Sequence, residues 1–493
     1  MPDYSGPDYS GPDLCAKSAR SILMLLRTGE IRITDLVDAS LERIKAVEPA
    51  VNAMPTVCAD RAYGWIDEIS DLEKSGCGWL GGIPIGVKDL NAVRGVKLTM
   101  GTWAMRDFVA RENDPLVDTL QANGAIVIGK TNTPEFGAGG NTFNQVFGMT
   151  RNAYDTSRNA GGSSGGAAVS LATGEVWLSQ GSDLAGSLRT PAGYNNVCGL
   201  RPTPGRAGGG PGPAAFLNEG INGPMARDIE DLALFLDAMT GYDPREPLTL
   251  EKPAVSFQEA LKQDIGPIRI AFAEDQGGFA PVEANVRTIL CKAMEVAQRS
   301  GMAVDEDCPD LPGLYETYVT LRGIHYGSVN GFVPDEIREH FKETLRRNIE
   351  AGVNQTSHDI YLAQRRRTEL YQRMRRFLAR YDVLAIPVVG LAPTPVEEEW
   401  PKVVDGIDQP DYVDWLRFSF LATVTALPAL SMPAGFTGDG LPIGIQLIGP
   451  PRGDAKVLQA GLALERALDL PKGPIDPVVR HETGAPDPTK RIE

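Results

Sequence analysis

The sequence predicts an α/β fold in which a mostly parallel sheet is flanked by helices. Two short β-branched runs bounded by glycine, GIPIGVKD at 82–89 and GAIVIGK at 124–130, have the pattern of buried strands. A helical pattern near 115–122 lies between them, and strand-like segments near the C-terminus precede a further helical pattern at 455–467. Strands that alternate with helices in this way are typical of a sheet covered by helices.

The composition is that of a globular protein with an acidic surface. The chain has 493 residues, of which 42% are apolar and 23% charged, close to the globular averages of roughly 45–50% and 25%. Its 64 acidic and 48 basic residues give a net charge of −16. This charge repels phosphate backbones and anionic lipids, so nucleic acids and membranes are not expected partners.

Cysteine and histidine patterns exclude several other classes. The six cysteines are scattered without a C-x-x-C pair, as expected for reduced thiols in a cytosolic chain. The four histidines form no H-E-x-x-H motif, so we expect no metal site and no cofactor. The N-terminus lacks the basic and apolar regions of a signal peptide, and no run approaches the ~20 apolar residues of a membrane span. We therefore expect a cytoplasmic location.

The remaining segments follow in chain order. A duplicated PDYSG predicts that residues 1–13 form a mobile tail. Apolar residues at helical spacing predict a helix over 15–26, and Thr34 is a candidate N-cap for a second. Glycine and serine crowd into 155–225, but apolar patterns such as AAVSLATGEVWL exclude a flexible linker there. Residues 245–380 are more polar and helical, and 484–493 form a polar tail.

One motif matches a phosphate-binding loop only formally. Gly124, Gly129, Lys130 and Thr131 satisfy G-x-x-x-x-G-K-[ST]. In such a loop the four intervening residues curl around a phosphate. Here they are Ala-Ile-Val-Ile, so a buried strand is the better interpretation.

A second motif allows an esterase. Gly162–Gly166 reads G-x-S-x-G, the nucleophile elbow of α/β-hydrolases, with Ser164 as nucleophile. That elbow needs a preceding strand and a later histidine. The preceding TSRNA is a poor strand, and the downstream histidines lie in polar helical or proline-rich contexts (His325, His340, His358, His481).

A third combination joins Lys88, the GGSSGG run and Ser187. Serine is a poor nucleophile without a base, and in the absence of a suitable histidine a neutral lysine is the remaining candidate. Burial at the end of the IPIGV run would lower the pKa of Lys88 by as much as ~3–5 units. Small residues around Ser187 can turn successive amides inward to hold an oxyanion, worth roughly 3–4 kcal/mol per donor. The alternatives are an ordinary lysine at a strand end and tight glycine packing.

Taken together, these motifs resemble the amidase signature family of serine hydrolases. The resemblance runs from about residue 14 to 470, and the motifs occur in the family's order: GGIPIGVKD, GKTNTPEFG, GGSSGGAA, GSDLAGSLRTPA, CGLRPTPGR and LPALSMPAGFTGDGLPIGIQLIG. It implies an α/β amidase signature fold, with a large mixed β-sheet core flanked by helices on both faces. It also implies a single domain, 14–483, in which 245–380 is a variable, mainly helical region that shapes the substrate site.

The resemblance also implies roles for particular residues. Ser187 would be the nucleophile, Ser163 the cis-serine and Lys88 the base. The backbone amides of Leu184, Ala185, Gly186 and Ser187 would form the oxyanion hole. Ser164, Asp183 and Arg189 would support these groups. The family's nucleophile loop is G-T-D-T-G-G-S, so Ser182, Leu184 and Ala185 depart from it. A positive φ at Ala185 would be strained without glycine.

The expected function is amide hydrolysis through a seryl acyl-enzyme, without a cofactor, by a monomer or homodimer. A small to medium hydrophobic or aryl amide is the expected substrate, because apolar residues cluster near the expected site: Met100, Trp103, Phe136, Phe143 and Phe147. The same chemistry would cleave carbamates (urethanes), esters or oligoamides. Two alternatives stay open: an esterase that uses Ser164, and an amidotransferase-type subunit that works with a partner.

Overall fold

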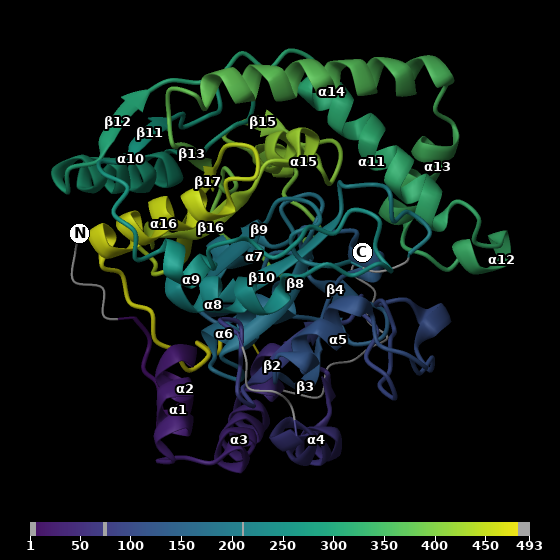
Figure 1. The fold of residues 1–493 in the computed structure, drawn as a ribbon. Coiled ribbons are helices and arrows are strands. Elements are labelled where there is room, and N and C mark those ends of the chain that lie inside the picture. The colour runs from purple at the N-terminus through teal and green to yellow at the C-terminus, as the bar shows by residue number, and fades with distance from the viewer. Residues whose placement is uncertain (1–5, 72–75, 210–211, 482–493) are drawn as a thin grey trace.

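A computed structural model describes residues 6–71, 76–209 and 212–481 of the chain (Figure 1). The predicted C-terminal tail, 484–493, and the first five residues of the predicted N-terminal tail lie outside the described residues. Within those ranges no helix combines the length and apolarity that a bilayer crossing requires.

An eleven-stranded mixed sheet forms the centre of the molecule. Six of its ten neighbouring pairs are antiparallel, so the mixed sheet implied by the family resemblance is confirmed and the mostly parallel sheet is wrong. Short turns such as the one between β16 and β17 join antiparallel strands and need no crossover helix. In spatial order the strands are β1 (Thr56–Val57), β3 (Ile126–Thr131), β2 (Pro84–Lys88), β8 (Leu178–Asp183), β10 (Ile221–Ala226), β9 (Cys198–Arg201), β16 (Ala429–Phe436), β17 (Pro442–Ile448), β13 (Val383–Pro387), β11 (Arg269–Phe272) and β12 (Ala303–Glu306).

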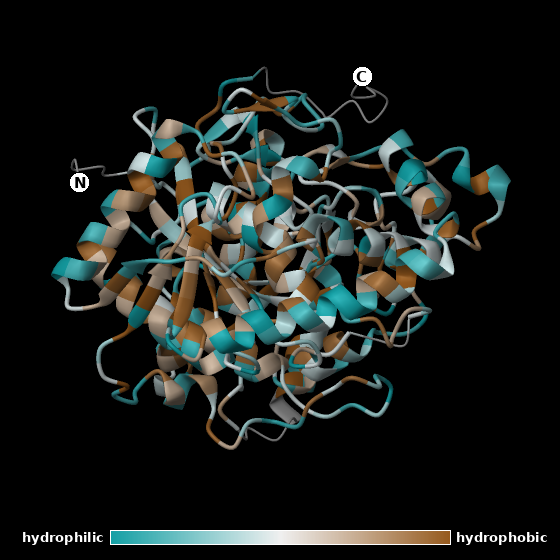
Figure 2. Ribbon diagram, turned by 90° about the horizontal axis from the view of Figure 1, so that it is seen from above, coloured by the Kyte–Doolittle hydropathy of each residue, from teal (hydrophilic) through white to brown (hydrophobic). Residues whose placement is uncertain are grey.

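Helices cover the faces of this sheet. One group comprises α6 (Gly165–Ala172) and α7 (Arg189–Tyr194), and a second comprises α8 (Ile229–Met239), α10 (Ala284–Arg299) and α16 (Asp454–Leu468). Every residue of β2, β3, β13 and β17 is buried, as expected for strands covered on both faces. Figure 2 shows hydrophobic strands inside and hydrophilic residues along the outer helices.

The N-terminal helices differ slightly from the prediction. The single helix expected over 15–26 is two helices, α1 (Asp13–Ala16) and α2 (Ala19–Thr28). The break comes at Ser18, whose extended backbone and Oγ, which accepts from the Ser21 amide, cap α2. They are followed by α3 (Ile33–Val51), which begins one residue before Thr34, and α4 (Ala59–Asp71).

The structure shows the conformation of the formal phosphate-loop match and of the segment that precedes the G-x-S-x-G motif. Residues 126–131 of the G-x-x-x-x-G-K-[ST] match form strand β3, preceded by α5 (Pro115–Ala122), and leave no loop for a phosphate. All of the TSRNA segment except Ala160 forms a strand, contrary to expectation, within β7 (Asp155–Asn159). It pairs with β6 (Arg151–Asn152) outside the central sheet. The other short pairs are β4 (Phe143–Asn144) with β5 (Gly148–Met149), and β14 (Val403–Val404) with β15 (Ile407–Asp408).

The region 245–380 is mainly helical but also supplies strands β11 and β12. After β12 the chain makes one long excursion before it returns to the sheet as β13. Figure 1 shows the excursion's helices above the sheet. They are α11 (Leu314–Asn330), α12 (Asp335–Arg338), α13 (Glu343–Val353) and α14 (Ser357–Phe377); α9 (Phe257–Ala260) precedes them, and α15 (Phe420–Thr425) packs against α11 and α14.

Candidate active site

The ends of two parallel strands place the candidate residues together. β2 ends at Lys88 and its parallel neighbour β8 ends at Asp183, so the chain leaves the sheet at the same edge in both cases. The Lys88 amide donates to the Gln180 side chain over 3.0 Å, which fixes the strand end. Ser163 approaches from a third segment, just before α6, and the Gly162–Ser163 peptide bond is cis.

Lys88 is fully buried among serine hydroxyls. Its Nζ lies 2.6 Å from Ser163 Oγ, 2.9 Å from Ser164 Oγ and 3.1 Å from Ser182 Oγ. Burial lowers the pKa of Lys88 from 10.5 to about 7, although the charge of Asp183 opposes this. About half of the amine is therefore neutral at pH 7 and able to accept a proton.

The neighbouring carboxylate does not neutralise Lys88. Asp89 follows directly in the chain, but its Oδ1 accepts from Lys130 Nζ over 2.9 Å, and both side chains are buried. Two further bonds from Thr99 satisfy the same carboxylate. The lysine of the formal phosphate-loop motif thus has a structural partner, and Lys88 has no ion pair among the described residues.

The hydroxyl geometry orients the neutral amine. Ser164 Oγ donates to the Ser182 carbonyl over 3.2 Å, so it can only accept from Lys88. A neutral amine that donates its two protons to Ser164 and Ser182 has its lone pair left for the Ser163 hydroxyl. This hydroxyl makes the shortest of the three contacts. The arrangement can move a proton from Ser163 to Lys88.

A buried ion network holds the loop that carries Ser187. Asp183 Oδ1 accepts from the Gly186 amide and Oδ2 from the Leu188 amide, each over 3.1 Å. Arg189 bonds both carboxylate oxygens at 3.0 and 2.8 Å, and Arg201 Nη1 donates to the Asp183 carbonyl over 2.6 Å. Burial favours the neutral acid, but the guanidinium groups outweigh it and hold the pKa of Asp183 well below its ordinary value. The structure thus brings the predicted pair of Asp183 and Arg189 together.

The predicted oxyanion amides need one correction. The Gly186 amide is taken by Asp183 and cannot also donate into the cavity. No described group accepts from the amides of Leu184, Ala185 or Ser187, so these three remain. The strain expected at Ala185 is absent because the positive φ, 84°, falls on Gly186 instead.

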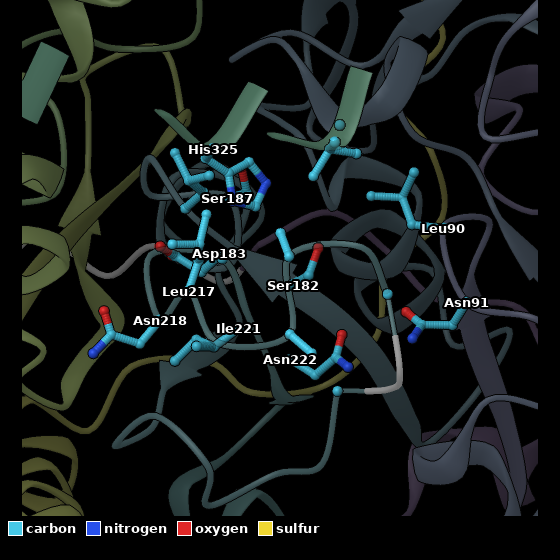
Figure 3. A pocket seen from close by; sticks show the side chains of 18 of the residues that line it. Leu90, Asn91, Ser182, Asp183, Ser187, Leu217, Asn218, Ile221, Asn222 and His325 are labelled. Carbon is cyan, nitrogen blue, oxygen red and sulfur yellow. The ribbon is translucent and has the colours of Figure 1, made fainter. Parts of the chain in front are cut away.

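Ser163 and Ser187 open into a cavity of about 470 Å³ (Figure 3). Its lining is largely apolar and includes Leu98, Met100, Phe136, Leu217, Leu248 and Val329. Of the apolar residues expected there, Met100 and Phe136 line it, whereas Trp103, Phe143 and Phe147 do not. Trp103 is 46% exposed and carries the Arg106 guanidinium over its ring.

Charges in the cavity are acidic. Asp114 and Glu246 line it and form no ion pair with a described residue, and no described lining residue is a lysine or arginine. Burial raises the pKa of both carboxyl groups. None of the described lining residues therefore offers a cationic side chain to an anionic substrate group.

Some residues at the site were missed from the sequence. Ser182 contacts Lys88, Arg201 holds the nucleophile loop, and His325, which was expected only in a polar helical context, lines the cavity. Ser182 belongs to the motif GSDLAGSLRTPA and Arg201 to CGLRPTPGR, so the sequence could have indicated both residues. His325 had none, because only the fold brings α11 to this edge. No described histidine bonds Ser164, and Ser164 does not line the cavity, so this geometry does not support an esterase elbow.

Comparisons with known proteins agree with this geometry. The Amidase family model matches residues 35–458. The chain is 32% identical to an acylamidase of Rhodococcus erythropolis over 464 residues, covering 91% of this chain and 94% of the relative. It is 33% identical to the A subunit of the glutamyl-tRNA(Gln) amidotransferase from Geobacillus stearothermophilus, covering 92% and 98%.

A solved structure has the same overall fold as this chain. The fold superposes on a bacterial aryl acylamidase of the amidase signature family with a TM-score of 0.84, at 27% identity and with 92% and 96% of the two chains covered. The match thus extends over nearly the whole fold. The chain belongs to the amidase signature family and is an amide-hydrolysing enzyme.

Proposed function

We propose that this enzyme hydrolyses small to medium, uncharged hydrophobic or aryl amides through an acyl-enzyme at Ser187. The observation that carries the proposal is the buried amine of Lys88, which lies 2.6 Å from Ser163 Oγ beside a largely apolar cavity into which Ser187 opens. A lysine in this state is a base at neutral pH, and in the proposed reaction the Ser163 hydroxyl relays the proton of Ser187 to it.

Each proton has a place in the proposed reaction. Neutral Lys88 takes a proton from Ser163, which takes one from Ser187 as Ser187 Oγ attacks the substrate carbonyl carbon. The amides of Leu184, Ala185 and Ser187 stabilise the oxyanion. Ser163 then protonates the leaving nitrogen as the C–N bond breaks, and Lys88 returns its proton to Ser163, so that the amine is neutral again. Water attacks the resulting ester and passes a proton through Ser163 to Lys88; the C–O bond to Ser187 then breaks, the acid leaves, and the same proton returns through Ser163 to restore the Ser187 hydroxyl.

Support for an uncharged substrate comes from the cavity lining. Apolar side chains dominate it, and Asp114 and Glu246, which have no ion-pair partner among the described residues, repel an anion. The similarity of the fold to that of an aryl acylamidase supports an aryl amide. Carbamates, esters and oligoamides fall within the same chemistry, because each presents a carbonyl carbon to Ser187.

A second candidate function is that of an amidotransferase-type component that works with a partner. The amidotransferase chains among the relatives favour it. The lining counts against it, because a glutamine substrate carries a free carboxylate and no described lining residue supplies a cation. We therefore favour the stand-alone hydrolase, as a monomer or homodimer.

The test labels the nucleophile. A fluorophosphonate probe is expected to modify Ser187, as located by peptide mass spectrometry, and the label should disappear in Lys88→Ala. Ser179→Ala is the matched control, since Ser179 is a buried serine of β8 whose hydroxyl bonds no described residue, and it should keep the label. A screen of neutral anilides should then show turnover. Labelling at Ser164 would overturn the triad, and turnover of glutamine in the presence of a partner protein would overturn the substrate class.

A further inference from the structure

His325 lies in the wall of the active-site cavity. It belongs to α11 and lines the same cavity as Ser187 (Figure 3). A methyl group placed on Gly220 would lie 3.1 Å from His325 Cε1 and 3.7 Å from Leu184 Cδ1. The imidazole is therefore separated from the nucleophile loop by little more than one glycine, within reach of a substrate bound at Ser187.

Unlike the asparagines of the cavity, His325 has no hydrogen-bond partner among the described residues. Asn91 donates to Asp114, and Asn222 donates to the Gly208 carbonyl over 2.9 Å. Asn218 bonds Arg367. By contrast, His325 Nδ1 is buried and unpartnered within the described part of the chain, and Nε2 bonds none of those residues either. Because buried polar groups are normally hydrogen-bonded, the imidazole is expected to bond a molecule that occupies the cavity.

The imidazole is neutral under ordinary conditions. Burial, with a smaller effect from the charge of Arg322, lowers the pKa of His325 to about 4. Arg322 lies one turn earlier on α11, and its guanidinium bonds Asn348, Tyr318 and Tyr412. Because an unpaired buried N–H is costlier than an unpaired lone pair, the single proton belongs on Nε2 and not on the enclosed Nδ1.

We propose that His325 is a specificity-determining residue that donates a hydrogen bond from Nε2 to an oxygen acceptor of the substrate, within a few bonds of the scissile amide. The inference rests on the proposed function and deepens it. The preferred substrates are uncharged amides that carry an ether or a second carbonyl oxygen close to the bond that breaks. Carbamates and oligoamides meet this description, and simple alkyl anilides do not.

Two isosteric substrate pairs test the proposal. Methoxyacetanilide and butyranilide exchange an ether oxygen for a methylene in the acyl part; 4-methoxyacetanilide and 4-ethylacetanilide do so in the amine part. The ratio of kcat/KM within each pair is measured for the wild type and for His325→Phe. For at least one pair the ratio should fall about 5- to 10-fold in His325→Phe, which is the effect of one neutral hydrogen bond. Comparing ratios cancels the intrinsic reactivity of each anilide.

Matched variants separate hydrogen bonding from shape. Val329→Ala, one turn further along α11 in the same cavity, should change kcat/KM but leave both ratios unchanged. His325→Gln should recover part of the preference, and Gly220→Ala, which presses on the ring, should reduce it without removing the imidazole. The inference would be overturned if the wild-type enzyme hydrolysed all four anilides with both kcat/KM ratios within about 2-fold of those of His325→Phe. The proposed function would then still stand. If the probe labelled Ser187 but the unlabelled wild-type enzyme hydrolysed none of the four anilides, the proposed function itself would be refuted.

Discussion

The pH dependence of kcat/KM tests the proposed base directly. The pKa of Lys88 falls from 10.5 to about 7 on burial, and at 1.36 kcal/mol per pH unit this corresponds to about 5 kcal/mol against the ammonium form. About half of the enzyme would hold a neutral Lys88 at pH 7, compared with roughly one molecule in 3,000 for an unshifted lysine.

The expected profile follows from the sign of this shift. The active form is the deprotonated one, so kcat/KM should rise about tenfold per pH unit below pH 7 and level off above pH 8. Between pH 5 and pH 9 the gain is about 100-fold. The assay follows hydrolysis of a neutral anilide, whose own charge does not change over this range. A flat profile from pH 5 to 10, or a rise that begins only above pH 9, would refute the assignment of Lys88 as base.

Three further predictions concern the loop and the cavity. Asp183→Asn leaves Arg189 and Arg201 without their buried carboxylate, so urea unfolding should show a loss of about 3–5 kcal/mol, and a loss below about 1 kcal/mol would contradict the role of this network. Gly186→Ala forces a side chain into φ 84° and to 3.0 Å from Ser419 Cβ, which should cost about 1–3 kcal/mol and lower kcat. Gly473→Ala, where a methyl group meets nothing, is its control, and equal effects of the two would refute the strain argument. Glu246→Gln should favour 4-acetamidobenzoate over acetanilide about fivefold relative to wild type, since it removes about 1 kcal/mol of charge repulsion; an unchanged ratio would show that the carboxylate does not face the substrate.

Local sequence singled out the candidate residues, and the order of the family motifs assigned the expected roles to them. Lys88 ends a short apolar run, and GGSSGG and GSDLAGS stand out by composition alone, so residue chemistry and motif order pointed to the same edge of the sheet. The same reasoning identified β3 as a strand despite its phosphate-loop letters, because Ala-Ile-Val-Ile cannot form a polar cradle.

Long-range pairing could not be obtained in that way. Strand direction in the middle of the sheet depends on which strands meet, and periodicity within one strand does not encode its neighbour. The use of the Gly186 amide by Asp183 depends on how one loop folds back on its own strand. The place of His325 depends on α11, whose residues lie far in sequence from Ser187 and reach it only through tertiary packing.

The long excursion between β12 and β13 has a consequence for how this enzyme can change its substrate. The groups proposed to react, Lys88, Ser163 and Ser187, precede the excursion in the chain, whereas His325, Tyr326 and Val329 reach the cavity from it. The excursion, which is inserted between two strands at the far side of the sheet from Lys88, therefore supplies one part of the cavity wall, while residues such as Leu98, Met100 and Phe136 supply the rest. A graft between relatives would have to keep the contacts that hold the excursion to the fold, among them the 2.7 Å ion pair of Arg367 with Glu219 and the 3.0 Å ion pair of Lys342 with Glu399. With such contacts retained, exchange of the excursion should change the substrate selectivity and leave the ends of β2 and β8 unchanged.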